Sequence, residues 1–189
     1  MRKADALTAV FVVVSILYPL GAAFAVRAFG PLWVVAALCV LLLARGALGL
    51  KRQIPLALTY GLIAVAAGIA LVAIFDRALS VRLYPALMNA AMLAAFAQTL
   101  WRGPSMIERF ARLMEPNLPE SGVRYTRIVT WIWVAFFAIN GAIAIWTAIY
   151  ADWSTWTLYN GLIAYIAMGV LFAGEWVVRP FARRAAKNA

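Results

Sequence analysis

The sequence contains no histidine and only one cysteine, Cys39, which lies inside an apolar run. Without histidine, the chain lacks the commonest general base and the commonest metal ligand of proteins. A single cysteine cannot form a disulfide within the chain, and a thiol among apolar residues with no base beside it is a weak nucleophile. The sequence also lacks a phosphate-binding loop and a serine-histidine-aspartate set. We therefore expect no catalytic residue, no metal site and no cofactor.

Charged residues are scarce as well. They make up 13% of the chain, whereas soluble domains carry roughly a quarter. Hydrophobic residues make up 66% of the chain, and its mean hydropathy is +0.89. Lipid must therefore surround most of the surface. The net charge of +10 accompanies no nucleic-acid-binding motif, so we expect it to reflect cations at the cytoplasmic membrane surface, with no nucleic-acid partner.

Long apolar runs dominate the sequence. A helix needs about 20 apolar residues to cross the hydrocarbon core of a bilayer. Proline and glycine mark the joints between such runs, which predicts one all-α, polytopic transmembrane domain over residues 1–189. The six predicted spans are residues 7–28, 32–50, 54–75, 83–101, 128–150 and 156–178. Two alternatives remain open: the first two runs could form a re-entrant pair, or residues 1–25 could be a signal peptide cleaved after Ala25.

The basic residues are divided unequally between the two sides that six spans create. Arg27, Arg77 and Arg82 fall on one side, and the other fourteen of the seventeen fall on the opposite side. Lysine and arginine collect in cytoplasmic loops of membrane proteins. We therefore expect a bacterial inner-membrane protein with both termini in the cytoplasm.

The longest polar stretch, residues 103–127, would then be a cytoplasmic loop. Ser105 and Glu108 have the spacing of a capping box, which predicts a helix over about 106–114. Its apolar residues recur at helical spacing, so the helix is amphipathic and suited to the membrane interface. The interpretations that remain open are a solvated connector that anchors the loop, a docking site for a partner protein and a binding site for lipid headgroups. The apolar stripe comprises Ile107, Phe110, Ala111 and Met114, and the expected lipid-contacting residues are Arg109, Phe110 and Arg112.

Two parts of the chain are similar to each other. Tyr84 and Tyr159 stand near the start of the fourth and sixth spans, and Trp101 and Trp176 follow each tyrosine by 17 residues. This pattern predicts that spans 3–4 and 5–6 are two similar helical hairpins running in the same direction. Tyrosine and tryptophan also gather at both membrane surfaces for unrelated reasons, so coincidence is the alternative.

Polar residues within and beside the spans are the candidate functional residues. Asn89, Gln98 and Asn140 are intramembrane amides, which usually hold helices together. A second group lies near the outer membrane surface, where it could bind a phosphate or an acyl headgroup or simply form an interfacial aromatic belt. This outer-face group comprises Asp76, Arg77, Arg82, Tyr84, Tyr150, Asp152, Trp153, Trp156, Tyr159 and Asn160.

Three segments carry a resemblance to known families: "GPSMIERFARLMEPNLPE", "YTRIVTWIWVAFFAINGAIA" and "WTLYNGLIAYIAMG". The chain resembles a bacterial family of small inner-membrane proteins encoded near fatty-acid-like genes for aryl polyene or xanthomonadin-type pigments. More distantly, residues 45–175 resemble intracellular septation protein A. Neither resemblance supplies catalytic residues. Together they imply a role in the envelope of a Gram-negative cell, close to the assembly of lipid or pigment-lipid.

Our main functional expectation is a non-enzymatic accessory or scaffold protein for envelope lipid or polyene-lipid biosynthesis or export. Membrane lipids, envelope-synthesis or division proteins and further copies of the chain are the expected partners. Two alternatives remain. A small lipid transporter or flippase would use Asn89, Gln98, Asn140 and Asn160 to line a polar groove. A membrane-embedded enzyme acting on lipid-linked acyl groups would bring Asp76, Asp152 and Glu175 into one pocket.

Overall fold

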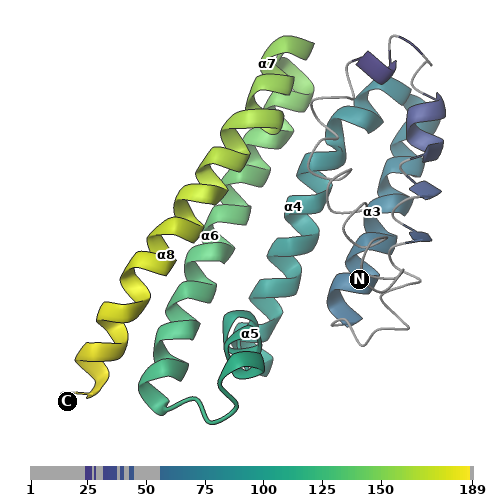
Figure 1. The fold of residues 1–189 in the computed structure, drawn as a ribbon. Coiled ribbons are helices and arrows are strands. Elements are labelled where there is room, and N and C mark those ends of the chain that lie inside the picture. Colours follow the sequence, from purple (N-terminus) through teal and green to yellow (C-terminus); the bar gives the residue numbers. More distant parts are fainter. Residues whose placement is uncertain are drawn as a thin grey trace, which may run out of the picture.

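A computed structural model describes residues 24–26, 28, 32–37, 39–40, 43–44 and 56–187. All elements in these residues are helices (Figure 1). The predicted all-α class is therefore confirmed. The helices are α3 (Leu56–Phe75), α4 (Arg77–Arg102), α5 (Met106–Met114), α6 (Glu120–Tyr150), α7 (Trp153–Leu158), the π-helical turn η1 (Tyr159–Ile163) and α8 (Ala164–Lys187).

Three of these helices are long and apolar enough to cross a membrane: α4, α6 and the continuous stretch Trp153–Arg179 formed by α7, η1 and α8. Tyr60–Phe75 of α3 is a shorter apolar helix. The chain is accordingly a membrane-embedded protein. The predicted spans 7–28 and 32–50 lie largely outside the described residues. Within these two spans, the structure describes only short helical pieces.

Two helices begin earlier than the membrane spans predicted within them. α4 begins at Arg77 rather than Leu83, because the side chain of Asp76 caps its N-terminus. α6 begins at Glu120, directly after Pro119, rather than at Ile128. The polar segment 120–127 was expected to be a loop, but a helix that continues beyond the bilayer can hold its polar residues in water.

The long helices stand side by side in the order α3, α4, α6 and α8 (Figure 1). Small residues allow close approach: a Cβ on Gly61 would lie 3.2 Å from the Cβ of Ala91, between α3 and α4. The short helix α5, the α5–α6 connection and the end of α8 lie at one end of the row, and α7 lies at the other (Figure 1). We call these the α5 end and the α7 end.

The buried core has two parts. One buried cluster joins α3, α4, α6 and α7 and includes Ile69, Val81, Ala148 and Trp156. The other joins α4, α5 and α6, with Phe96 and Trp133 at its centre. The ring of Trp133 also lies 4.7 Å from that of Phe172, between ring centroids, which connects α6 to α8. The two parts hold the helices together near the two ends of the bundle.

Candidate functional site

Two aspartates begin helices at the α7 end. The Asp76 carboxylate accepts a hydrogen bond from the backbone N–H of Leu79 at 2.9 Å and caps α4. The Asp152 carboxylate accepts from the backbone N–H of Thr155 at 2.7 Å and caps α7. Both aspartates are exposed, and both interact electrostatically with Arg82. Two predicted outer-face acids therefore flank one predicted arginine.

Arg82 closes the C-terminus of α6. Its guanidinium donates to the carbonyl oxygen of Thr147 at 2.6 Å and to that of Ala151. The last carbonyls of a helix have no partner within the helix and carry its negative dipole end, so a cation is stabilising there. The guanidinium carbon also lies 5.5 Å from the ring centroid of Trp153, which adds a cation–π contact.

Trp156 joins α7 to α4. Its side chain is fully buried, and its indole Nε1 donates to the backbone carbonyl of Arg82 at 3.0 Å. This bond attaches α7 to the first turns of α4.

Asn160 lies in the π-helical turn η1 and is buried. Its side-chain nitrogen donates to the hydroxyl oxygen of Thr147 at 3.1 Å and to the carbonyl oxygen of Trp156 at 2.9 Å. π-Turns inside α-helices often occur at functional sites. Here the π-helical turn positions the side-chain amide of Asn160 so that it links α7 to α6.

The position of Asp152 at the start of α7 changes its titration. The bond from the backbone of Thr155 lowers the pKa of the Asp152 carboxyl below its ordinary value of 3.8, and the charge of Arg82 adds to the effect. The carboxylate is therefore ionised at neutral pH. An ionised carboxylate cannot act as a proton donor there.

The structure brings only part of the predicted outer-face group together. Arg82, Asp152, Trp153, Trp156 and Asn160 form one connected set through the contacts above. Of the other members, Asp76 caps α4 and interacts with Arg82 electrostatically, and Tyr84 is buried in the same core cluster as Trp156. Tyr150 and Arg77 are exposed, and the hydroxyl of Tyr159 bonds to Asn140.

The interior amides form a second network between α4, α6 and η1. Asn140 donates to the side-chain oxygen of Asn89 at 3.0 Å, and Asn89 donates to the carbonyl oxygen of Pro85 at 2.8 Å. The hydroxyl of Tyr159 donates to the side-chain oxygen of Asn140 at 2.9 Å. Gln98 does not share in this network and is exposed. Asn89 and Asn140 therefore act as helix contacts.

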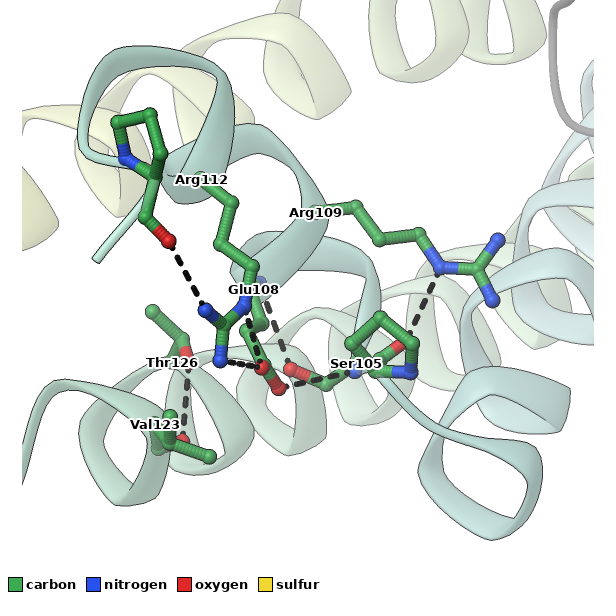
Figure 2. A network of polar contacts seen from close by, with 8 residues as sticks. Ser105, Glu108, Arg109, Arg112, Val123 and Thr126 are labelled. Carbon is green, nitrogen blue, oxygen red and sulfur yellow. Dashed lines mark hydrogen bonds and ion pairs between the residues drawn. The ribbon is translucent and has the colours of Figure 1, made fainter. Parts of the chain in front are cut away.

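At the α5 end, the predicted capping box is confirmed (Figure 2). The backbone N–H of Glu108 donates to the Ser105 hydroxyl, and the Ser105 N–H donates to the Glu108 carboxylate, each at 3.4 Å. The guanidinium of Arg112, one turn further along α5, forms an ion pair with the Glu108 carboxylate at 2.8 Å. The carboxylate of Glu108 is buried, so the arginine compensates its charge.

Two threonine hydroxyls from neighbouring helices complete this N-terminus. The backbone N–H of Met106 donates to the hydroxyl of Thr99, on α4, at 2.9 Å. The N–H of Ile107 donates to the hydroxyl of Thr130, on α6, at 3.3 Å. A threonine inside an apolar helix gives no local signal of such a distant backbone partner. With Ser105, these hydroxyls satisfy three successive donors, so this helix N-terminus offers none of them to an external anion.

At both ends of the bundle, polar side chains cap helices and bond to neighbouring ones. Among the described residues, no group of three histidine, cysteine or acidic side chains could hold a metal ion. Glu175 lies on α8, where its backbone carbonyl accepts a hydrogen bond from the hydroxyl of Tyr125 at 3.5 Å. Asp76 and Asp152 instead cap helices at the α7 end.

No protein family, curated protein or solved structure matches this chain.

Proposed function

We propose that the protein is a six-span inner-membrane protein, with both termini in the cytoplasm, that serves as a non-enzymatic scaffold in envelope lipid or polyene-lipid biosynthesis or export. The observation that carries this proposal is the use of its polar side chains. Arg82, Asp152, Asn140 and Asn160 are all bonded to backbone or side-chain groups of neighbouring turns and helices. Side chains whose hydrogen bonds are all made within the protein favour a structural role over a catalytic one.

The hairpin repeat is part of this proposal, and matched positions support it. Asp76 and Asp152 cap the helices that return from the α7 end. Trp101 and Trp176 are 73% and 76% exposed, as expected for side chains in the two corresponding positions of an interfacial belt. In this arrangement the α5 end lies at the cytoplasmic surface and the α7 end at the periplasmic surface.

A scaffold must present a surface to its partner. At the α7 end, Tyr150 is 74% exposed, and its ring lies 6.5 Å from that of Trp146, between centroids. Exposed aromatic side chains are common at protein interfaces, where they supply large contact areas at low entropic cost. We place the docking site for an envelope-synthesis protein at this end.

Photo-crosslinking in living cells tests this proposal. A crosslinking amino acid in place of Tyr150 should form an adduct with a protein of envelope-lipid synthesis. The same amino acid in place of Ile139, which is 63% exposed at the midpoint of the predicted span 128–150, should give adducts with lipid alone. Lipid adducts from both positions would contradict the scaffold role, as would turnover of a lipid-linked acyl substrate by the purified protein.

A further inference from the structure

The outward face of α5 differs from the stripe that helical spacing predicts. Ala111, a member of that stripe, is buried against the bundle together with Met106 and Glu108. Phe110 and Leu113 are instead 49% and 82% exposed. Residues three apart on a helix lie side by side, so these two side chains form one apolar patch on the outer surface.

Several contacts fix where this patch lies. α5 is seen nearly end-on in Figure 1, whereas α4 and α6 run lengthwise, so α5 lies across their ends. The hydroxyls of Thr99 and Thr130 hold its first turn against both long helices. Trp101 and Trp131 form an exposed edge-to-face pair at the same end, with ring centroids 6.1 Å apart. Tryptophan side chains gather at the level of the lipid headgroups.

The two arginines of α5 differ in what they can still bind. Arg112 donates to the carboxylate of Glu108 and to the carbonyl oxygen of Pro116, so it is used within the protein. Arg109 donates only its Nε, to the carbonyl oxygen of Pro104 at 3.0 Å. Figure 2 shows its two terminal nitrogens directed away from Glu108. Arg102, two residues before Pro104, is exposed at the end of α4.

We propose that the outer face of α5 docks on the bilayer in which the protein is embedded and binds anionic phospholipid. Phe110 and Leu113 enter the boundary between headgroups and acyl chains. Arg109 and Arg102 bind the lipid phosphate, to which guanidinium groups are complementary in charge and geometry. Arg112 is a structural residue. This inference depends on membrane embedding and not on the proposed scaffold role, so it survives if no partner is found.

Spin labelling of the purified full-length chain tests the docking. Because Cys39 is the only cysteine, a Cys39→Ser background allows a nitroxide to be attached at Leu113→Cys or at Asn117→Cys. Both positions are exposed, but Asn117 lies in the α5–α6 connection. In phosphatidylcholine vesicles containing phosphatidylglycerol, the label at Leu113 should be more accessible to oxygen than to a water-soluble nickel complex. The label at Asn117 should show the opposite order.

Matched arginine variants test the lipid assignment. Removing phosphatidylglycerol should reduce the immersion of the Leu113 label, and Arg109→Gln should reproduce that reduction with phosphatidylglycerol present. Arg112→Lys, which keeps a positive charge beside Glu108, should leave the dependence on phosphatidylglycerol intact. Arg102→Gln, outside α5, should act in the same direction as Arg109→Gln even if α5 itself is sensitive to substitution.

Four outcomes would overturn the proposal. The first is a Leu113 label that favours the nickel complex in both lipid compositions, and the second is immersion that does not depend on phosphatidylglycerol. The third is an equal effect of Arg109→Gln and Arg112→Lys, and the fourth is immobilisation of the label only when membrane proteins are added. The last would assign the surface to a protein partner instead.

Discussion

The side-chain nitrogen of Asn140 donates to the side-chain oxygen of Asn89 at 3.0 Å, across the contact between α6 and α4. The next residue, Gly141, allows α6 and α4 to approach closely, because a Cβ at this position would lie only 3.1 Å from the Cβ of Asn89. A polar bond and a small residue at one crossing are the usual means by which helices associate in membranes, where lipid is as apolar as the helix surface.

The bond between the two asparagines predicts coupling between their substitutions. Asn89→Ala and Asn140→Ala should each destabilise the protein, and the double variant should lose less than the sum, with a coupling of about 0.6 kcal/mol. Equilibrium unfolding in mixed detergent micelles measures this. Gln98→Ala, at an exposed position of α4, is the control and should have little effect. Strict additivity of the two asparagine variants would contradict the bond.

Gly141 and Gly169 should respond oppositely to alanine. Gly141→Ala places a methyl group against Asn89, and overpacking of this kind typically costs about 1 to 3 kcal/mol. A Cβ on Gly169 meets nothing within 4 Å, so Gly169→Ala should be neutral or should stabilise α8 by up to about 1 kcal/mol through helix propensity. Thermal unfolding of both variants in one detergent provides the comparison. Equal losses would show that Gly141 does not set the α4–α6 spacing.

Trp156 should matter more to stability than an exposed tryptophan. Trp156→Phe removes the donor to the Arg82 carbonyl, a loss of about 1 kcal/mol, and leaves a small cavity that adds to it. Trp176→Phe, at a side chain 76% exposed, should change the unfolding midpoint little. If the two substitutions have the same effect, the link between α7 and α4 contributes nothing measurable.

The lowered pKa of the Asp152 carboxyl predicts that the stability of the protein depends on pH. Because its pKa is lowered in the folded protein, its contribution is complete above the ordinary carboxyl value of 3.8 and is lost as the pH falls through the lowered folded value. Asp152→Asn keeps a capping side chain but cannot titrate. The variant should therefore approach the stability of the unchanged protein as the pH falls into that window. A constant difference down to about pH 2 would contradict this role.

The sequence predicts the helices at the α5 end better than the contacts at the α7 end, and the reason is physical. Ser105 and Glu108 cap a helix within one turn, so their spacing alone reveals their partners. Arg82 bonds to backbone carbonyls of Thr147 and Ala151, 65 and 69 residues away. Every residue has a carbonyl, so no side-chain pattern marks these partners.

The outer-face group illustrates the same limit. Placing residues at one membrane surface does not determine which way each side chain turns around its helix. Trp156 bonds to Arg82 of α4 and Asn160 bonds to Thr147 of α6. Tyr159, between them in sequence, also reaches α6, but it bonds to Asn140, which precedes Thr147 by about two turns. The π-helical turn alters the rotation per residue at this point, so ordinary helical spacing could not predict which side chains meet.

Cysteine labelling in intact cells tests the central claim, that the bundle spans the inner membrane with its α5 end in the cytoplasm. In the Cys39→Ser background, single cysteines are introduced at the exposed positions Ser154, in α7, and Asn117, in the α5–α6 connection. A membrane-impermeant maleimide is added after the outer membrane has been permeabilised. We predict that Ser154→Cys reacts in intact cells and that Asn117→Cys reacts only after lysis. Ready labelling of Asn117→Cys in intact cells would contradict the orientation and the cytoplasmic placement of α5.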